Sequence, residues 1–274
     1  NLMRDMIKTI LVTGAAGFIG RNLCQQLLGN GYRVKALLRS SEQATMLPSE
    51  LEYITGDLSD ISGLLEACKG IDVVIHLAGV AHVNNIAKKM LQEVNVEGTR
   101  RLLQAAIDNR VTRFVFISSS LACVAEEQNT YSNGYGQSKL GAEQLVRSAW
   151  ERRVIETVVL RPVNVYGPGM KGNIAAMVSL ISRGRLPPLP SLDTHLSLVS
   201  VEDLACAILL AIGACEANGK TYLVTDGLDY SIKDMEQAIY AAVGKRVPAW
   251  RTPHVVLYSA ASIAGWAAKI RSFF

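Results

Sequence analysis

Two side chains of this sequence stand at a spacing that suits proton transfer. Tyr135 and Lys139 are four residues apart in a segment with helical periodicity, so a helix would project both from one face. A phenol with its ordinary pKa of about 10 is a poor base at neutral pH. A neighbouring ammonium group would lower that pKa. The pair therefore predicts a phenol that exchanges a proton with a substrate.

A glycine-rich turn offers a second candidate function. Gly14, Gly17 and Gly20 follow a short apolar run and open a helical pattern. Glycines in this context permit a tight turn and close approach of the backbone to a pyrophosphate, while the helix amino terminus supplies amide donors. The acidic residue expected about 20 positions later, at the ribose, is missing. Leu38 takes its place and Arg39 follows, and since guanidinium suits phosphate, we expect NADP(H) to be favoured over NAD(H).

The elements that must position these groups alternate along the chain. Strands alternating with helices predict an α/β fold with a doubly wound parallel sheet. We predict strands at 9–13, 33–38, 51–55, 73–77, 113–118 and 157–161, and helices at 18–28, 61–68, 88–109, 135–151, 173–183 and 201–212. A Gly-Pro-Gly loop after Tyr166 breaks this rhythm. We therefore expect a dinucleotide-binding domain over 1–166 and a smaller substrate-binding lobe over 167–274, with the chain free to interleave between them.

Composition narrows the choice of partners. With 49% hydrophobic and 19% charged residues in 274, the chain is neither disordered, collagen-like nor a small disulfide scaffold. A net charge of +4 without a run of five like charges argues against nucleic acid as a partner and favours a small molecule. The five scattered cysteines lack a CxxC pair, which predicts reduced thiols in a cytoplasmic protein and no metal site.

The end of the sequence is apolar. No segment reaches the roughly 18 uncharged apolar residues that a membrane span requires. The stretch 253–274 has helical spacing with cations near its end, so we expect it to pack on the lobe, with peripheral contact to a membrane surface as the alternative.

Six motifs, in order, resemble the extended short-chain dehydrogenase/reductase family of the NAD-dependent epimerase/dehydratase type, which has a Rossmann fold. They are TGAAGFIG (13–20), GDL (56–58), HLAG (76–79), NVEGT (95–99), FISSS with YGQSK (116–120 and 135–139) and RPVNVYGPG (161–169). The resemblance implies an NAD(P)-dependent oxidoreductase or epimerase that acts on nucleotide sugars.

The resemblance also implies roles for single residues. The catalytic residues would be Tyr135, Lys139 and a serine hydroxyl. We assign this hydroxyl to Ser119, with Ser120 as the second choice. If Ser119 is the catalytic serine, Ser120 would contact the substrate. The implied cofactor contacts are Gly14, Gly17, Phe18, Ile19, Gly20, Arg39, Asp57, Leu58, Leu77, Ala78, Gly79, Asn95, Tyr135, Lys139 and Pro162. The further implied substrate contacts are His82, Asn164, Lys171 and Asn173.

One segment departs from the family pattern. Leu121–Ala125 replaces a Tyr-Gly that family members often carry, and we expect a loop there that walls the substrate pocket. Family members often dimerise through the helices corresponding to 88–109 and 135–151, so a homodimer is a further expectation.

The sequence leaves three alternatives open for the reaction that the enzyme catalyses. The missing acid favours net reduction, so our first expectation is an NADPH-dependent reductase of a 4-keto nucleotide sugar. GPGMKGN (167–173) resembles enzymes of polysaccharide synthesis, and the second expectation is a UDP-hexose or UDP-N-acetylhexosamine 4-epimerase. A reductase of small carbonyls or sterols is the third. A binding protein without chemistry would be expected to lose the Tyr or the Lys.

Overall fold

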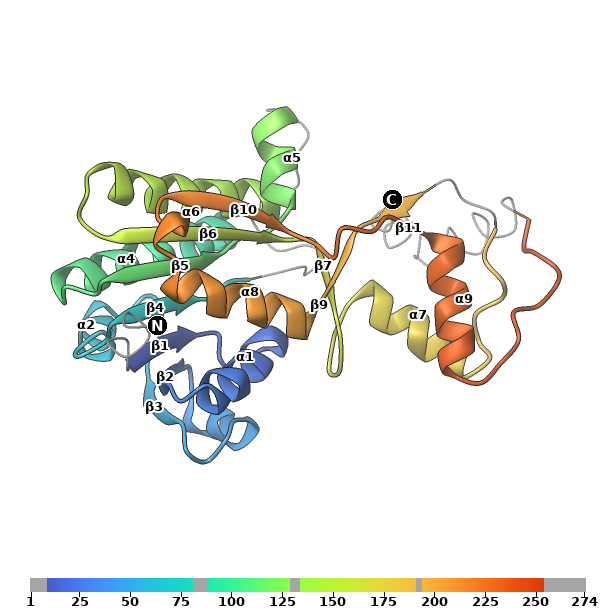
Figure 1. Cartoon of the computed structure of the whole chain (residues 1–274), viewed down its shortest axis with the longest axis horizontal. Coiled ribbons are helices and arrows are strands. Elements are labelled where there is room, and N and C mark those ends of the chain that lie inside the picture. The colour runs from blue at the N-terminus through green and yellow to red at the C-terminus, as the bar shows by residue number, and fades with distance from the viewer. Residues whose placement is uncertain (1–8, 81–87, 129–133, 191–193, 254–274) are drawn as a thin grey trace. The chain divides into compact units, whose positions relative to one another are not determined.

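A parallel sheet organises the first part of the chain (Figure 1). The structure, a computed structural model, describes residues 9–80, 88–128, 134–190 and 194–253. Within them a seven-stranded sheet has the order β10-β6-β5-β4-β1-β2-β3, and each neighbouring pair is parallel. Its strands are β1 (Thr9–Thr13), β2 (Arg33–Leu38), β3 (Glu52–Thr55), β4 (Val73–His76), β5 (Arg113–Ile117), β6 (Glu156–Pro162) and β10 (Lys220–Val224). The doubly wound α/β fold is confirmed.

Helices cover both faces of this sheet. On one side lie α1 (Phe18–Gly29) and α8 (Val201–Gly213), and on the other lie α2 (Ile61–Ala67), α4 (Gly98–Asp108) and α6 (Gly134–Glu151). The central strands β1, β4, β5 and β6 are buried on both faces, whereas the edge strands β3 and β10 are largely exposed. In β5, Val115 and Ile117 pack toward α1 and α8, while Phe114 and Phe116 pack toward α4 and α6. Because the strands are parallel, the predicted motifs at their carboxyl ends meet along one edge.

Two predicted segments differ from the structure. The expected loop 121–125 is a helix, α5 (Leu121–Gln128), which begins where the Ser119 hydroxyl accepts a hydrogen bond from the Leu121 amide. The single helix expected over 88–109 consists of α3 (Lys88–Leu91), a π-helical segment (Gln92–Glu97) and α4. The Thr99 hydroxyl donates to the Asn95 carbonyl four residues earlier, beside this wider turn, and such turns are frequent at functional sites.

The chain divides into two units that interleave. The first holds the residues up to Val165 together with Val199–Val224, and the second holds Tyr166–Leu198 and the chain from Thr225 onward. The prediction left the chain free to interleave, and α8 and β10, from the range 167–274, belong to the first unit. Helix α8 packs against α1, and β10 adds to the sheet beside β6, which explains their return.

The second unit has a small core of its own. Met177 and Ile181 from α7 (Asn173–Ser182) pack with Met235 and Tyr240 from α9 (Ile232–Ala242). A capping box between Ser231 and Asp234 begins α9. The remaining elements are β7 (Asn164–Tyr166), β8 (His195–Leu196), β9 (Leu198–Ser200), β11 (Tyr230–Ser231) and the 3-10 turns Ser41–Met46 and Cys215–Ala217.

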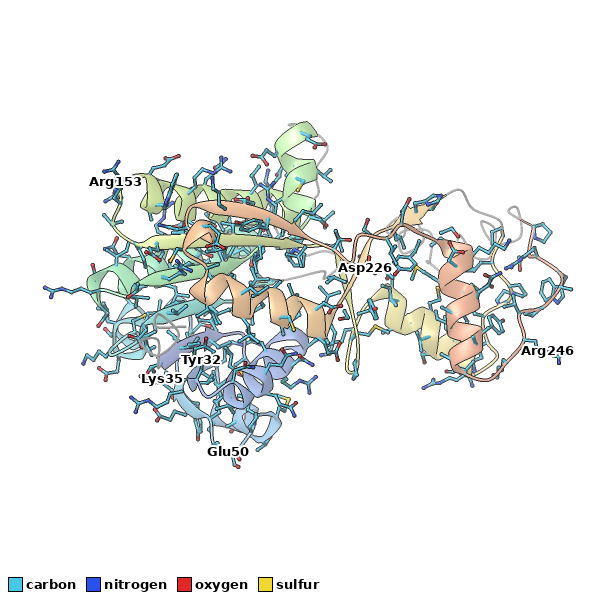
Figure 2. All side chains as sticks on the ribbon, in the orientation of Figure 1. Tyr32, Lys35, Glu50, Arg153, Asp226 and Arg246 are labelled. Carbon is cyan, nitrogen blue, oxygen red and sulfur yellow. The ribbon has the colours of Figure 1, made fainter. Side chains whose placement is uncertain are left out.

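Charged side chains lie at the surface of the first unit, together with some exposed apolar ones such as Leu210. Figure 2 shows charged side chains such as Glu50 and Arg153 at the periphery of the first unit, whereas Tyr32 is buried in its core. None of the helices that the structure describes has the length and apolar character needed to cross a membrane.

Two glycines of α1 provide a matched test of the turn that begins this helix. A Cβ on Gly20 would collide with the backbone of Ala15, 2.7 Å from its Cα, whereas a Cβ on Gly29 would meet nothing within 4 Å. We expect Gly20→Ala to lower the free energy of unfolding by about 1–3 kcal/mol, and Gly29→Ala to change it by about 1 kcal/mol or less. Urea denaturation of both variants measures the difference, and equal effects would contradict the close packing of helix on turn.

Candidate active site

Three motifs far apart in the sequence meet at the carboxyl edge of the sheet. A Cβ placed on Gly79 would lie 3.0 Å from Asn95 Oδ1 and 3.9 Å from Lys139 Nζ. Gly79 follows β4, Asn95 lies in the π-helical segment and Lys139 lies on α6. The HLAG, NVEGT and YGQSK motifs therefore build one location, and the absence of a side chain at residue 79 is what lets them approach.

The glycine turn beside this location has the form of an anion site. Gly14 has φ +72°, and a Cβ there would come within 2.8 Å of the Ala78 nitrogen. Helix α1 starts after Gly17 with no side chain capping its amides and no acidic residue in its first turn, where Phe18 and Ile19 lie. Open amide donors at a helix amino terminus fit the pyrophosphate of a dinucleotide. These residues fit the group that the sequence predicts.

Tyr135 and Lys139 share α6, as the sequence predicts, but their electrostatics differ from the expectation. Lys139 Nζ donates a hydrogen bond of 2.6 Å to the Ile117 carbonyl and lies 4.5 Å from the centre of the Phe116 ring. Burial lowers the pKa of Lys139 to about 8, partly opposed by Glu143, and burial raises the pKa of Tyr135 to about 12. The expected lowering of the phenol pKa by Lys139 is therefore wrong for this structure. Loss of hydration raises the pKa of the phenol, and the Lys139 ammonium is directed at the Ile117 carbonyl.

The serine run, residues 118–120, follows β5 and hydrogen-bonds to the backbone of β6. Ser118 N donates to the Leu160 carbonyl, and Ser120 N donates to the Pro162 carbonyl. Ser119 Oγ accepts from the Leu121 amide, and both Ser119 and Ser120 are partly exposed. The buried Ser118 hydroxyl has no hydrogen-bond partner among the residues the structure describes. An unpaired buried hydroxyl at this edge also fits a site that takes a polar ligand.

A chain of buried hydrogen bonds links the glycine turn to the π-helical segment. The Ala78 amide donates to Thr13 Oγ1, which lies 2.7 Å from His76 Nδ1, and His76 Nε2 lies 2.9 Å from Thr99 Oγ1. Thr99 uses its only hydroxyl proton on the Asn95 carbonyl, 2.6 Å away, so it must accept from Nε2–H. His76 is therefore the neutral Nε2–H tautomer, and Thr13 donates to Nδ1. Burial lowers the pKa of His76 to about 3, with Lys139 adding to the effect.

Asn95 extends this chain to the helix that carries the Tyr-Lys pair. Its Oδ1 accepts from the Val80 amide at 2.7 Å, and its Nδ2 donates to the Val80 carbonyl and to Ser138 Oγ. Ser138 Oγ in turn donates to the Tyr135 carbonyl. Asn95 is 2% exposed. It holds the segment after β4 against α6, beside Gly79, which like Asn95 is predicted to contact a cofactor.

The other predicted cofactor contacts lie at the ends of the neighbouring strands. Asp57 follows β3, and its carboxylate accepts from the Ser59 amide and hydroxyl, which lowers its pKa. Leu58 is buried against Gly98 of α4. Arg39 follows β2 and is exposed, with the charge of Asp57 near enough to interact. Leu77 and Ala78 continue β4, with the Leu77 amide bound to the Thr13 carbonyl.

The predicted substrate contacts are placed less completely. His82 lies outside the described residues. Asn164 lies on β7 and is exposed, next to Pro162 and Val163 of the first unit. Lys171 and Asn173 belong to the second unit, where Asn173 begins α7. The roles of all four stay predictions.

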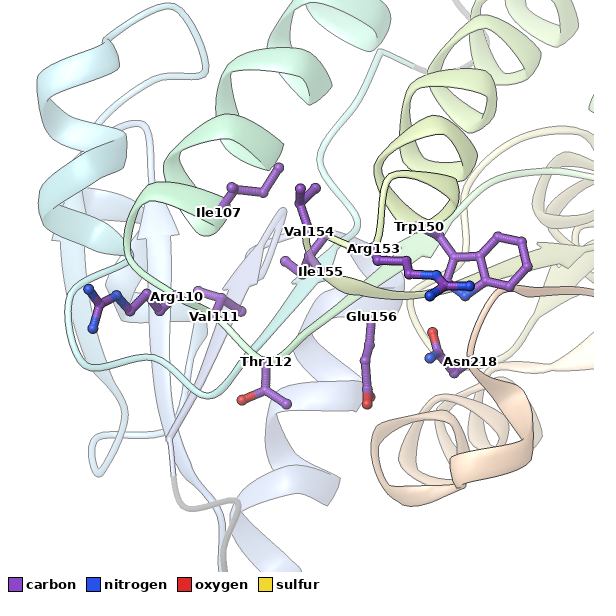
Figure 3. Close-up of a pocket in the computed structure, with 10 residues that line it drawn as sticks. All are labelled: Ile107, Arg110, Val111, Thr112, Trp150, Arg153, Val154, Ile155, Glu156 and Asn218. Atoms are coloured by element: carbon purple, nitrogen blue, oxygen red, sulfur yellow. The ribbon is translucent and has the colours of Figure 1, made fainter.

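A hollow at the other edge of the sheet takes no part in this arrangement. It has a volume of about 430 Å³, and Arg110, Trp150, Arg153, Glu156 and Asn218 are among the residues that line it (Figure 3). It lies at the amino ends of β5 and β6, and none of the predicted site residues lines it. Within the described ranges no cluster of His, Cys, Asp and Glu side chains is arranged to hold a metal ion.

A model of the NAD dependent epimerase/dehydratase family matches residues 10–225. The chain belongs to this family. The family predicted from the six motifs is thus confirmed, and the protein is an enzyme of the NAD-dependent short-chain dehydrogenase type.

Relatives of this family member cover most of its length. UDP-glucose 4-epimerase from Vibrio cholerae is 34% identical over 266 residues, which are 91% of this chain and 80% of the relative. The structure of MoeE5 in complex with UDP-glucuronic acid and NAD has a TM-score of 0.75 at 27% identity and covers 87% of this chain and 83% of its own. The epimerase Mth375 from Methanothermobacter thermautotrophicus, with TM-score 0.79 and 24% identity over 92% and 82% of the two chains, has the same fold.

Several residues that build the site of this epimerase/dehydratase family member were not predicted from its sequence. Thr99 and Ser138 were passed over because hydroxyl residues are common in helices, although Thr99 stands four residues after Asn95 and Ser138 directly precedes Lys139. Glu143 stands four residues after Lys139, and that spacing alone places it on the same face of α6. Arg161 binds it across the sheet edge.

The state of His76 gives a pH-dependent prediction. Because its folded pKa of about 3 lies below the unfolded value of about 6.5, the stability due to neutral His76 is complete above pH 6.5 and is lost as the pH falls toward 3. We expect stability to fall by up to about 1.4 kcal/mol per pH unit in this window, and less steeply in His76→Gln. Nitrogen NMR should find only Nε2 protonated at about pH 5; a doubly protonated ring there would contradict the assignment.

Proposed function

We propose that this enzyme epimerises a nucleotide sugar at a ring hydroxyl, with 4-epimerisation of a UDP-hexose as the reaction. The observation that carries the proposal is the Tyr135–Lys139 face of α6, set beside the serine run and the open glycine turn. Its relative over 91% of the chain is named UDP-glucose 4-epimerase, and MoeE5 binds UDP-glucuronic acid together with NAD. Epimerisation was the second expectation from the sequence, and these comparisons favour it over the first.

The chemistry divides between cofactor and side chains. A dinucleotide held at the glycine turn would supply hydride transfer from the sugar carbon and back to it. Tyr135 takes the hydroxyl proton in the oxidising half and gives it back in the reducing half. The Ser119 hydroxyl, or that of Ser120, holds the sugar oxygen within reach of the phenol. The oxidising half requires the phenolate of Tyr135. Burial raises the pKa of this phenol to about 12 in the free protein, so Tyr135 must lose its proton before it can accept the proton of the sugar hydroxyl.

A second candidate function is net reduction of a 4-keto nucleotide sugar with NADPH. The observation that favours it is the end of β2, where the expected acid is replaced by buried Leu38 and exposed Arg39. Arg39 donates its amide to Gln43 Oε1, while no hydrogen bond of its guanidinium occurs within the described part of the chain. A guanidinium in this position can bind a 2′-phosphate in a bidentate manner. A reductase needs such a cofactor in each turnover, whereas an epimerase retains its own.

The two functions differ in the fate of a label. The enzyme is incubated with UDP-glucose deuterated at C4, and the product is analysed by NMR. An epimerase yields UDP-galactose that keeps the deuterium without net change in nicotinamide absorbance, and Tyr135→Phe should lose about 10² or more of the rate with unchanged cofactor affinity. Consumption of NADPH with a UDP-4-keto-sugar, and no conversion of UDP-hexoses, would replace the first function by the second.

Cofactor choice is tested at Arg39. We propose a preference for NADP(H), so Arg39→Ala should weaken NADPH binding by about tenfold or more and leave NADH binding nearly unchanged. Titration of nicotinamide fluorescence measures both affinities. Arg33→Ala, at an exposed residue at the start of the same strand, is the control. Equal affinity of the wild-type enzyme for NADH and NADPH would refute the preference.

A further inference from the structure

Helix α5 is the segment in which this chain departs from its family pattern, and it carries the serine run at its start. The Ala122 and Cys123 amides donate to the carbonyls of Ser119 and Ser120, so the serines are continuous with the first turn. The helix has eight residues and packs against α6. A helix this short is unstable by itself, and tertiary contacts must hold it. Its fully buried side chains in the described positions are those of Ala122 and Ala125, which provide little apolar contact area.

Arg161 supplies the specific polar contact that α5 makes with the sheet. Its side chain is 9% exposed and lies on β6. Nε donates to both oxygens of buried Glu143, and Nη2 donates to Glu143 at 2.6 Å and to Glu126 Oε2 at 2.8 Å. Nη1 lies 3.3 Å from Cys123 Sγ, which accepts its hydrogen bond. One guanidinium thus holds α6 on one side and two residues of α5 on the other.

The backbone on either side of Arg161 binds the serine run that precedes α5. Leu160 and Pro162, the two neighbours of Arg161, accept the amides of Ser118 and Ser120. Glu143 stands one helical turn beyond Lys139 and two beyond Tyr135. Arg161 therefore connects two helices through one side chain. They are α5, which begins at the serines, and α6, which bears the Tyr-Lys pair.

We propose that Glu126, with Cys123, is a positioning residue of the active site: by binding Arg161 it fixes α5 so that the serine hydroxyl stays in register with Tyr135. The proposal rests on the proposed function for its kinetic consequence, since the serine acts on the reacting sugar oxygen. It assigns a role to residues outside the six motifs, in the segment that this sequence does not share with its family pattern. A small shift of a reacting group can cost as much as 10² in rate, so loosening α5 has a kinetic cost.

The geometry allows a substitution that leaves the buried pair intact. Glu126 is 45% exposed, whereas Glu143 is 2% exposed, so Glu126→Gln leaves Arg161 bound to Glu143 as a neutral pair. No buried charge is left without a partner, which is the usual reason that such changes unfold proteins. Glu127, the next residue of α5, is exposed and forms no ion pair among the described residues. Glu127→Gln is the matched control.

The test combines kinetics with hydrogen exchange on the full chain. We expect Glu126→Gln to lower kcat by about tenfold, with the KM for the sugar and the affinity for NADPH changed by about twofold or less, and Glu127→Gln to change none of them. Glu126→Gln is also combined with Ser119→Ala and with Ser120→Ala. In the background that lacks the acting hydroxyl, Glu126→Gln should have almost no further effect on kcat. Amides 121–126 should exchange faster in Glu126→Gln than in Glu127→Gln.

Each outcome decides the matter. An unchanged kcat in Glu126→Gln, or the same loss in both serine backgrounds as in the wild type, overturns the proposal. Unchanged exchange of the α5 amides also overturns it, and this measurement needs no substrate. If the wild-type enzyme converts no nucleotide sugar, the proposed function fails while faster exchange in Glu126→Gln still supports the anchoring of α5 by Arg161.

Discussion

The hydrogen bonds that satisfy buried His76 at the carboxyl edge of the sheet constrain the rest of this structure. His76 lies fully buried between Thr13 and Thr99. Its Nε2 donates a hydrogen bond to Thr99, and its Nδ1 accepts one from Thr13. Because Thr99 commits its proton to the Asn95 carbonyl, the direction of each hydrogen bond in the chain is fixed. A buried polar network that is complete in this way favours a single arrangement of the elements it joins. The glycine turn, the end of β4 and the π-helical segment are therefore held as one body.

Charged groups also act on Lys139, the lysine of the Tyr-Lys pair. Burial favours the neutral form of Lys139, and the carboxylate of Glu143 favours the charged form, so two opposed effects bring its pKa to about 8. Arg161 holds the Glu143 carboxylate in three hydrogen bonds, which raise the pKa of the guanidinium. Lys139 and Glu143 thus stand one turn apart on α6, and Arg161 on β6 holds the carboxylate whose charge favours the ammonium form of Lys139.

Local patterns in the sequence predicted the sheet and the edge where the site lies, because each depends on residues near in the chain. The alternation of strand and helix patterns predicted the sheet, and the glycine spacing after a strand together with the Tyr-Lys pair at helical spacing predicted the edge. The helix at 121–128 was not predicted, since its main support is Arg161, 35 positions beyond Glu126 in the chain. The electrostatics of Tyr135 were predicted with the wrong sign, because spacing places a cation near a phenol but contains no information about dehydration. The return of α8 and β10 to the first unit likewise depends on pairing with β6 and α1, far away in sequence.

The interleaved chain has a consequence for how this protein can change over evolution. The sheet is completed only by β10, after the chain has already supplied 166–198 to the second unit, and the rest of that unit follows Val224. In terms of chain order, the second unit is an insertion between two sheet strands together with an extension after the last one. Insertions and extensions of this kind can be lengthened, exchanged or rewritten while every strand keeps its neighbours. The strand order of the main sheet can therefore persist while the two segments of the second unit change in length and sequence.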